Sequence, residues 1–137
     1  MSILGNRVLR KEDPKFLTTG GEYVDDVPLP GAVHVTYVRS TIAHARITSI
    51  DTSEAALAPG VLAVFAGAEV GPELGNFPSD MDALNQAMTR PWLATDVVRY
   101  VGEPVAAVVT EERYQGEDAA ELVYVEYDPL PAVVDAG

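Results

Sequence analysis

Alternating and continuous apolar runs divide much of the chain into strand and helix segments. The run Val105–Thr110 (VAAVVT) is almost unbroken and of strand length, which predicts a strand buried on both faces. Within 111–122, Ala119 and Leu122 recur at helical spacing among acidic residues, which predicts an amphipathic helix. The segment Val123–Tyr127 (VYVEY) then returns to a strand pattern. We expect these three segments to form a right-handed crossover that joins two parallel strands.

A second strand–helix–strand unit precedes the first along the chain. Ala32–Arg39 alternates as a strand does, and Ala45–Asp51 is a further strand candidate. The short segment Ser53–Ala58 (SEAALA) has high helix propensity, and Pro59-Gly60 ends it. Val61–Ala66 (VLAVFA) follows as a buried strand. Two such units in a short chain indicate an α+β domain.

The N-terminal segment, residues 1–20, lacks steady periodicity. It contains four of the nine basic residues of the chain, and Pro14 opposes a continuous helix. We therefore expect an extended basic arm. It could pack against an acidic surface of its own domain or of a partner, and the sequence does not separate these alternatives.

A second irregular segment covers residues 71–95. It is rich in glycine and proline, and Met81–Met88 could form a short helix. A connection of this length inside a compact domain is usually functional, disordered or an interaction segment. Trp92 is the only tryptophan of the chain. It either pins the loop to the core or serves as an exposed interface anchor.

Length and composition narrow the class of protein. The 137 residues suit one domain, 1–137, with a core of its own. No apolar run approaches the roughly 20 residues of a membrane-spanning helix, and the N-terminus lacks the pattern of a signal peptide. The absence of cysteine excludes disulfides, a cysteine nucleophile and cysteine-ligated zinc or iron–sulfur clusters within this chain. We expect a cytoplasmic location.

The chain is strongly acidic, with a net charge of -12. From residue 71 onward, 13 acidic residues stand against three arginines. Such a surface repels phosphate backbones, so we expect no nucleic-acid partner. The excess serves either solubility or an acidic docking face.

Candidate catalytic and metal-binding residues are few. His34 and His44 have no acid at i±3 or i±4 on a recognisable helix, and no H-E-x-x-H pattern occurs. Three pairs of adjacent acids lie where strand neighbours would point to opposite faces or where negative charge would favour a helix N-terminus. These pairs are Asp25-Asp26, Glu111-Glu112 and Glu117-Asp118. We assign both histidines and all three pairs structural roles.

Glycine motifs give no support for nucleotide binding. Gly102-Glu103-Pro104 precedes the buried run and suits a turn, with Pro104 opening the strand. Gly20-Gly21 has no helix pattern after it, and neither a phosphate-binding loop nor a G-x-S-x-G elbow occurs. From the residues alone we therefore expect no catalytic, cofactor-binding or metal-binding residue in this chain.

Six segments follow one another along the chain: RKEDPKFLT, GEYVDDVPLPGAVH, VRSTIAHARITSIDTS, PGVLAVFAG, DVVRYVGEPVAAVV and AAELVYVEYDPLPAVVD. In this order they together resemble the N-terminal α/β-hammerhead domain of the large subunit of molybdenum hydroxylases. That family includes xanthine dehydrogenase, aldehyde oxidase and aerobic carbon monoxide dehydrogenase. The arm ending in FLTxxGxYVDD is most similar to the carbon monoxide dehydrogenase-type large subunits.

The resemblance implies an α/β-hammerhead, which we expect to be built from the strand–helix–strand units with a mixed sheet. It also implies a parent oxidoreductase that binds molybdenum with a pterin dinucleotide and hydroxylates a carbon centre with oxygen from water. Iron–sulfur clusters and FAD on partner domains or subunits would accept the electrons. The catalytic glutamate and pterin-binding loops of the family lie beyond Gly137, so the resemblance transfers no site residue.

Two departures from the family pattern are modest. Thr41 stands where proline is usual, and Gly116 stands where alanine is common, which should cost the helix about 1 kcal/mol. Two functions remain open: a catalytically silent domain of a larger molybdoenzyme subunit, or a free-standing binding or assembly domain. The ending PLPAVVDAG is linker-like and favours the first. The sequence identifies neither the substrate (carbon monoxide, an aldehyde, a purine or another N-heterocycle) nor the oligomeric state.

Overall fold

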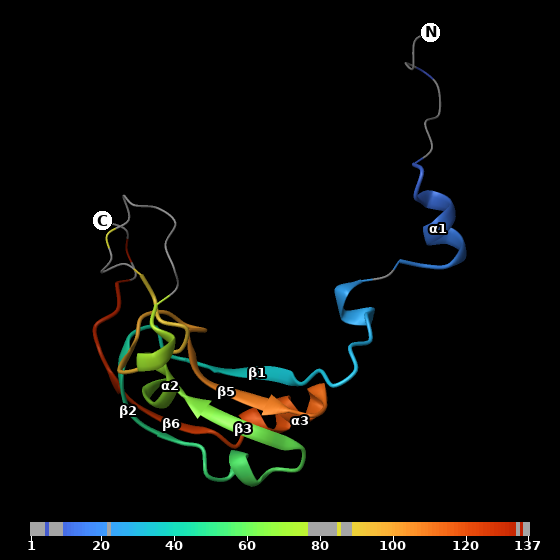
Figure 1. The fold of residues 1–137 in the computed structure, drawn as a ribbon. Helices are drawn as coiled ribbons and strands as arrows, with labels where there is room; N and C mark the ends of the chain where they lie inside the picture. Colours follow the sequence, from blue (N-terminus) through green and yellow to red (C-terminus); the bar gives the residue numbers. More distant parts are fainter. Residues whose placement is uncertain are drawn as a thin grey trace. The chain divides into compact units, whose positions relative to one another are not determined.

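The structure is a computed structural model that describes residues 5, 10–21, 23–76, 85, 89–133 and 135. It divides the chain into two units, residues 1–32 and residues 33–137. The strands belong to the second unit (Figure 1). No described helix is both long and apolar enough to cross a bilayer.

The first sheet of the larger unit has the strand order β1-β5-β3. Its central strand β5 (Pro104–Thr110) pairs antiparallel with β1 (His34–Arg39) and with β3 (Val61–Ala66). Since both edges of β5 are paired and its inner face packs into the core, residues 105–108 are 9% exposed or less. The predicted buried strand is confirmed.

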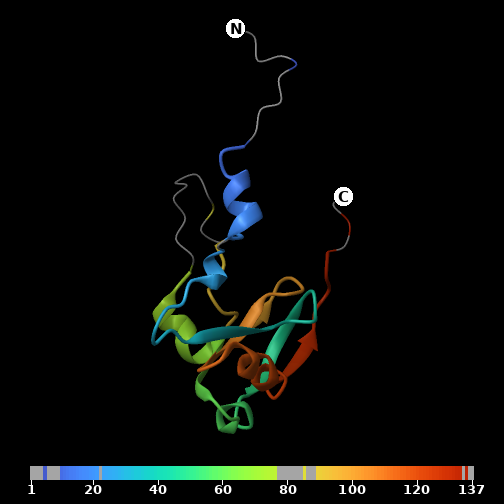
Figure 2. The same ribbon diagram turned by 90° about the vertical axis from the view of Figure 1, so that its right-hand side faces the viewer.

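The second sheet has the strand order β4-β2-β6. Strand β2 (Ala45–Asp51) pairs antiparallel with β4 (Val97–Val98) and with β6 (Tyr124–Pro129). Figure 2 shows β6, in red, beside β2. The predicted bounds of β2 and β3 agree with the structure.

The predicted parallel crossover and the mixed sheet are wrong. All strand pairs of the described residues are antiparallel, and β5 and β6 lie in different sheets although a helix joins them. Both hydrogen-bonding edges of β5 are occupied by β1 and β3, so β6 pairs with β2 instead. The α+β class itself is confirmed.

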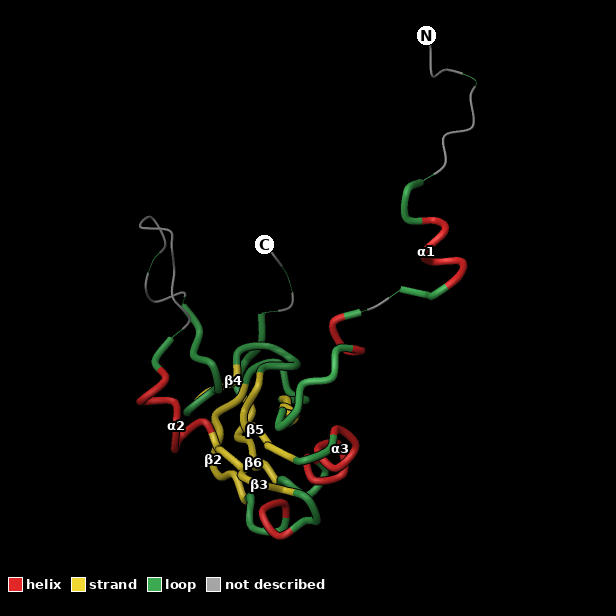
Figure 3. The backbone as a smooth tube through the Cα atoms, turned by 45° about the vertical axis from the view of Figure 1, so that its right-hand side comes forward, coloured by secondary structure: helices red, strands yellow, loops and turns green. Residues whose placement is uncertain are grey.

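Apolar side chains from both sheets meet in one core. Val38 of β1, Ile50 of β2 and Val125 of β6 each pack against two clusters of buried residues. One cluster contains Ala106 and Val108 of β5. In Figure 3 the strands run through the middle of this unit, with α2 and α3 on opposite sides of them.

Helix α2 (Gly67–Leu74) begins directly after β3 and extends into residues 71–95, where we expected irregular structure. The carboxylate of Glu69 accepts a hydrogen bond from the amide of Ala66 (3.0 Å), which stabilises the first turn. Its glycines depress helix propensity but allow close packing, since a Cβ at Gly67 would overlap the carbonyl of Ala94. The helix predicted over 53–58 is only a single 3₁₀ turn, η2 (Ala55–Leu57).

Helix α3 (Arg113–Ala120) confirms the helix predicted after β5. Its start is fixed by two side chains. The amide of Glu112 donates to Gln115 Oε1 (2.9 Å), and Thr110 Oγ1 donates to the carbonyl of Glu112 (2.8 Å). Glu111 and Glu112 therefore lie at the N-terminal end of the helix, as their assigned structural role requires.

The smaller unit, residues 1–32, contains helix α1 (Asp13–Thr18) and the 3₁₀ turn η1 (Val24–Asp26). The prediction of an extended arm is therefore wrong for 13–18. Pro14 lies in the first turn of α1, where its missing N–H costs nothing. Helix α1 buries none of its residues. The short helix suggested for Met81–Met88 falls almost entirely outside the described residues.

Candidate interaction surface

The outer faces of the two sheets differ in character. On the β4-β2-β6 sheet, exposed polar residues oppose each other across β2 and β6, as in the pairs Arg46–Asp128 and Ser49–Glu126. Ser49 Oγ donates a hydrogen bond to Glu126 Oε2 (2.7 Å). This is the expected pattern for a sheet with one solvated face.

The outer face of the β1-β5-β3 sheet is apolar instead. Val35 is 50% exposed, Tyr37 is 45% exposed and Phe65 is 41% exposed. A contiguous set of exposed large apolar side chains usually marks a contact surface. No other element of the described residues in this unit covers them fully.

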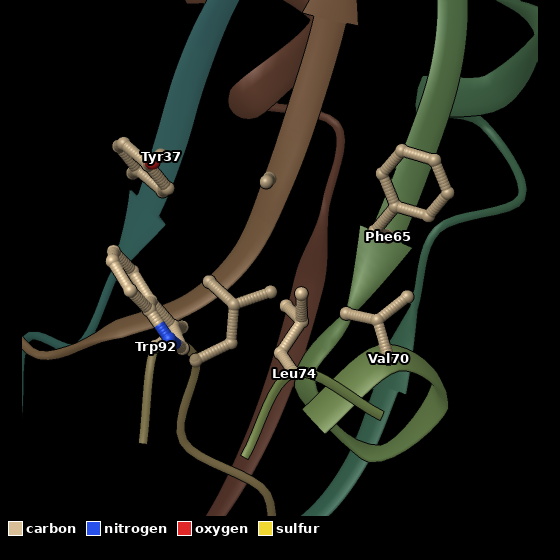
Figure 4. A pocket seen from close by; sticks show the side chains of 7 residues that line it. Tyr37, Phe65, Val70, Leu74 and Trp92 are labelled. Carbon is tan, nitrogen blue, oxygen red and sulfur yellow. The ribbon is translucent and has the colours of Figure 1, made fainter. Parts of the chain in front are cut away.

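Strand register produces a groove on this face. Tyr37 of β1 and Phe65 of β3 both stand opposite Ala107 of β5. Because the alanine is small, it forms a floor between two aromatic walls. Figure 4 shows the two walls, Tyr37 and Phe65. Leu74 of α2 and Trp92 lie at one end of the groove, whose volume is about 450 Å³. We call this feature the apolar groove; its lining is completed by Val70 and Leu93.

The structure distinguishes the two roles considered for Trp92. The loop is held to the core by its neighbours: Leu93 is 4% exposed, Ala94 is fully buried, and the amide of Ala94 donates to the carbonyl of Pro104 (2.8 Å). Trp92 itself remains 42% exposed and lines the apolar groove. This arrangement favours the interface-anchor role.

A smaller cavity of about 270 Å³ adjoins the apolar groove and shares Tyr37 and Trp92 with it. Two arginines line this cavity. Arg39 lies 5.6 Å from the centre of the Tyr37 ring and donates to the carbonyl of Gly102 (2.9 Å). Arg90 donates to the hydroxyl of Tyr100 (2.8 Å). We call this feature the arginine cavity.

Glu103 is the one acidic residue of the described part of the chain that is buried, at 2% exposure. Its Oε2 accepts a hydrogen bond from the amide of Arg99 (2.5 Å) and thereby closes the turn before β5. Its Oε1 has no hydrogen-bond partner among the described residues, because the nearest guanidinium nitrogen of Arg99 is 4.0 Å away. Glu103 also lines a wider polar cavity of about 790 Å³.

Sequence reasoning assigned Glu103 no role beyond its place in a turn motif. The only local signal is an acid directly before a buried strand. Gly102 supports the turn with a φ of 91°, a value that glycine adopts readily.

The residues weighed as catalytic candidates lie apart in the fold. His34 is partly buried on β1, whereas the Nδ1 of His44, before β2, lies 2.6 Å from the carbonyl of Pro131 and fastens the segment after β6. Asp26 accepts a hydrogen bond from the amide of Tyr23 (2.9 Å) in the smaller unit. In the described ranges, no three histidine or acidic side chains gather where they could hold a metal ion. That this chain contains no site residue stays a prediction.

Two antiparallel sheets that share one core, with an apolar groove on the outer face of one of them, define a small α+β domain. Comparison with known families makes the class specific. The family described as "Aldehyde oxidase and xanthine dehydrogenase, a/b hammerhead domain" matches residues 18–131. The chain belongs to this family.

Known relatives agree with this assignment. The chain is 45% identical to the nicotine 6-hydroxylase large subunit of Paenarthrobacter nicotinovorans, over 98% of this chain and 16% of the relative. It is 44% identical to the carbon monoxide dehydrogenase large chain of Afipia carboxidovorans, over 96% of this chain and 16% of that protein. The crystal structure of a Cu,Mo-CO dehydrogenase superposes with a TM-score of 0.81 at 44% identity, covering 96% of this chain and 16% of the other.

These figures confirm the resemblance noted in the sequence, including the similarity to carbon monoxide dehydrogenase large chains. They also show how much of each relative the chain covers. The chain spans 16% of the length of these relatives.

Proposed function

We propose that this chain is a structural, non-catalytic domain of the large subunit of a molybdenum- and pterin-dependent oxidoreductase. The observation that supports this most is the apolar groove. The groove lies on a domain that aligns over nearly its full length with relatives described as large subunits or large chains. The aligned region is only 16% of the length of those relatives. A domain that leaves one sheet face apolar is suited to being covered by the rest of a larger protein.

The cofactors of the parent enzyme would be held outside these residues. A structure similar to this chain is described as a Cu,Mo enzyme, and we extend molybdenum, with a pterin dinucleotide, to the parent subunit on that basis. This chain does not fit iron–sulfur clusters, because they need cysteine thiolates and it contains none. We assign the iron–sulfur clusters and FAD to partner domains or subunits, and no cofactor to this domain.

The partners that we propose follow from the same assignment. The domain packs against the downstream molybdenum-binding domains of its own subunit, which in turn contacts the FAD-binding and iron–sulfur subunits. We propose a cytoplasmic location and no nucleic-acid partner, in keeping with the net charge of -12.

A free-standing assembly domain is the alternative, since an uncovered apolar groove could equally receive a separate protein. The reading frame beyond Gly137 separates the two. Continuation into cofactor-binding domains supports the enzyme domain. A natural stop, with no neighbouring gene for such domains, supports the alternative.

The function is tested on the full-length product and its partner subunits. We expect metal analysis to find molybdenum and a dye-linked assay to detect oxidation of an aldehyde, an N-heterocycle or carbon monoxide. The 137-residue chain, assayed in parallel, should bind no molybdenum pterin tightly and turn over none of these substrates. Turnover by the 137-residue chain would contradict the structural role.

A further inference from the structure

We propose that the apolar groove and the arginine cavity together receive one extended segment of the same large-subunit polypeptide, from outside these 137 residues. The segment places a bulky apolar side chain over Ala107 and a neighbouring carboxylate against Arg39. This inference rests on the proposed function, and it names the kind of segment that covers the apolar face.

The apolar half of the inference follows from the shape of the groove. Tyr37 and Phe65 form two walls above the small side chain of Ala107, and Trp92 lies at one end (Figure 4). A cavity of about 450 Å³ with this lining accommodates one large aliphatic or aromatic side chain. Tyrosine, tryptophan and arginine are the residues that most often dominate binding energy at interfaces.

The charged half follows from where the cations lie. The described lining of the arginine cavity contains Arg39 and Arg90 and no acidic residue. The Arg39 guanidinium is also held in place, by its bond to the Gly102 carbonyl and by the Tyr37 ring. A fixed planar guanidinium favours a carboxylate over other acceptors.

The two cavities are close enough for one segment. The apolar groove and the arginine cavity share the lining side chains Tyr37 and Trp92. Groups bound in the two cavities would therefore be neighbours. An extended peptide places neighbouring side chains on alternate faces and every second side chain on the same one. We therefore expect the apolar side chain and the carboxylate to lie about two residues apart.

Occupancy by the same polypeptide follows from the comparison of lengths. This chain corresponds to 16% of single large-subunit chains. A segment tethered to the domain meets the groove at a high effective concentration, so it outcompetes a second copy or a separate protein of equal intrinsic affinity.

Photo-crosslinking in the full-length subunit, assembled with its partners, tests the occupant. Tyr37→p-benzoylphenylalanine places a crosslinker on the wall of the groove. Tyr124→p-benzoylphenylalanine is the matched control, on the outer face of the other sheet, where Tyr124 is 67% exposed. We expect the probe at position 37 to crosslink to a peptide beyond residue 137 of the same chain, with an acidic residue near the crosslinked apolar residue. The control should not give this peptide.

Charge reversal tests the carboxylate. We expect Arg39→Glu to raise the rate of proteolytic cleavage within the crosslinked segment roughly tenfold, because cleavage tracks the population of the open state. Arg46→Glu, on the polar outer face, should leave the rate unchanged. Replacing the partner carboxylate by lysine in the Arg39→Glu background should restore protection.

The outcomes separate this inference from the proposed function. A crosslink to a second copy, a crosslink to another subunit or no crosslink at all overturns the inference, even when the complex contains molybdenum and is active. Failure of the charge swap to restore protection overturns the arginine–carboxylate contact. Absence of molybdenum from the folded full-length complex overturns the proposed function instead.

Discussion

Gly116 of α3 lies directly against Thr36 of β1, so close that a Cβ atom at position 116 would overlap the threonine hydroxyl. Gly116 is buried at this contact, between the helix and the β1-β5-β3 sheet. The glycine therefore has a reason that helix propensity alone did not suggest. It lets the helix approach the strand, and Thr36 provides the hydroxyl that fills the space.

We predict that Gly116→Ala destabilises the protein despite improving the helix. Alanine should gain about 1 kcal/mol in propensity, but overpacking at a buried contact costs roughly 1–3 kcal/mol. Urea unfolding measures the net change. Thr36→Ala removes the hydroxyl that the new Cβ would overlap. In the Thr36→Ala background, Gly116→Ala should therefore lower the stability by much less than it does in the original protein. A Gly116→Ala protein more stable than the original would contradict the close contact.

Glu103 should matter for stability through one of its two oxygens. Glu103→Ala removes the acceptor for the Arg99 amide and leaves a part-buried N–H without its partner, which costs about 1–3 kcal/mol. Glu103→Gln keeps an acceptor of the same shape and should cost less than half as much. Thermal unfolding compares the two, with the exposed Glu121→Ala as control. If Glu103→Ala and Glu103→Gln lower the stability equally, the hydrogen bond from the Arg99 amide does not account for the contribution of Glu103 to stability.

Val108 tests the core that the two sheets share. Its side chain is fully buried within one of the two clusters, so Val108→Ala should cost roughly 2–3 kcal/mol through lost burial and a residual cavity. Val101 is 63% exposed in the turn before β5, and Val101→Ala should change stability by less than about 0.5 kcal/mol. Denaturant unfolding of both variants measures the two changes in the free energy of unfolding. A small loss of stability in Val108→Ala would contradict the place of Val108 in the core.

Asp51 offers a prediction about pH. Hydrogen bonds from the side chain and the backbone of Ser53 hold the pKa of the Asp51 carboxyl below its usual range. The stabilisation is therefore present above the ordinary pKa of an aspartate and is lost as pH falls through the lowered pKa. Ser53→Ala should raise the pKa of Asp51 in an NMR titration. Ser49→Ala, whose hydroxyl bonds Glu126 instead, should not move it.

The parts of the fold that depend on local pattern could be predicted from the sequence. The bounds of β2 and β3 follow from their apolar and β-branched runs, and α3 follows from its helical spacing. Partner choice between strands depends on distant residues, so the sequence suggested a parallel crossover where the structure has two antiparallel sheets. Helix α2 was missed because its glycines, needed for close packing, look like loop residues.

The candidate surface was only partly foreseen. Trp92 was identified as a candidate interface anchor from its type and surroundings alone. The groove beside it depends on Tyr37 and Phe65 both facing Ala107 across three strands, a register that no single segment specifies. The unpartnered oxygen of Glu103 likewise depends on a fold that removes it from water.

The account depends most on the claim that this domain serves a molybdenum enzyme without performing its chemistry. The most direct measurement is the molybdenum content of the purified full-length complex, with the 137-residue chain measured in the same way. We predict stoichiometric molybdenum in the full-length complex and none in the 137-residue chain. A folded full-length complex without molybdenum, or molybdenum retained by the 137-residue chain, would contradict the account.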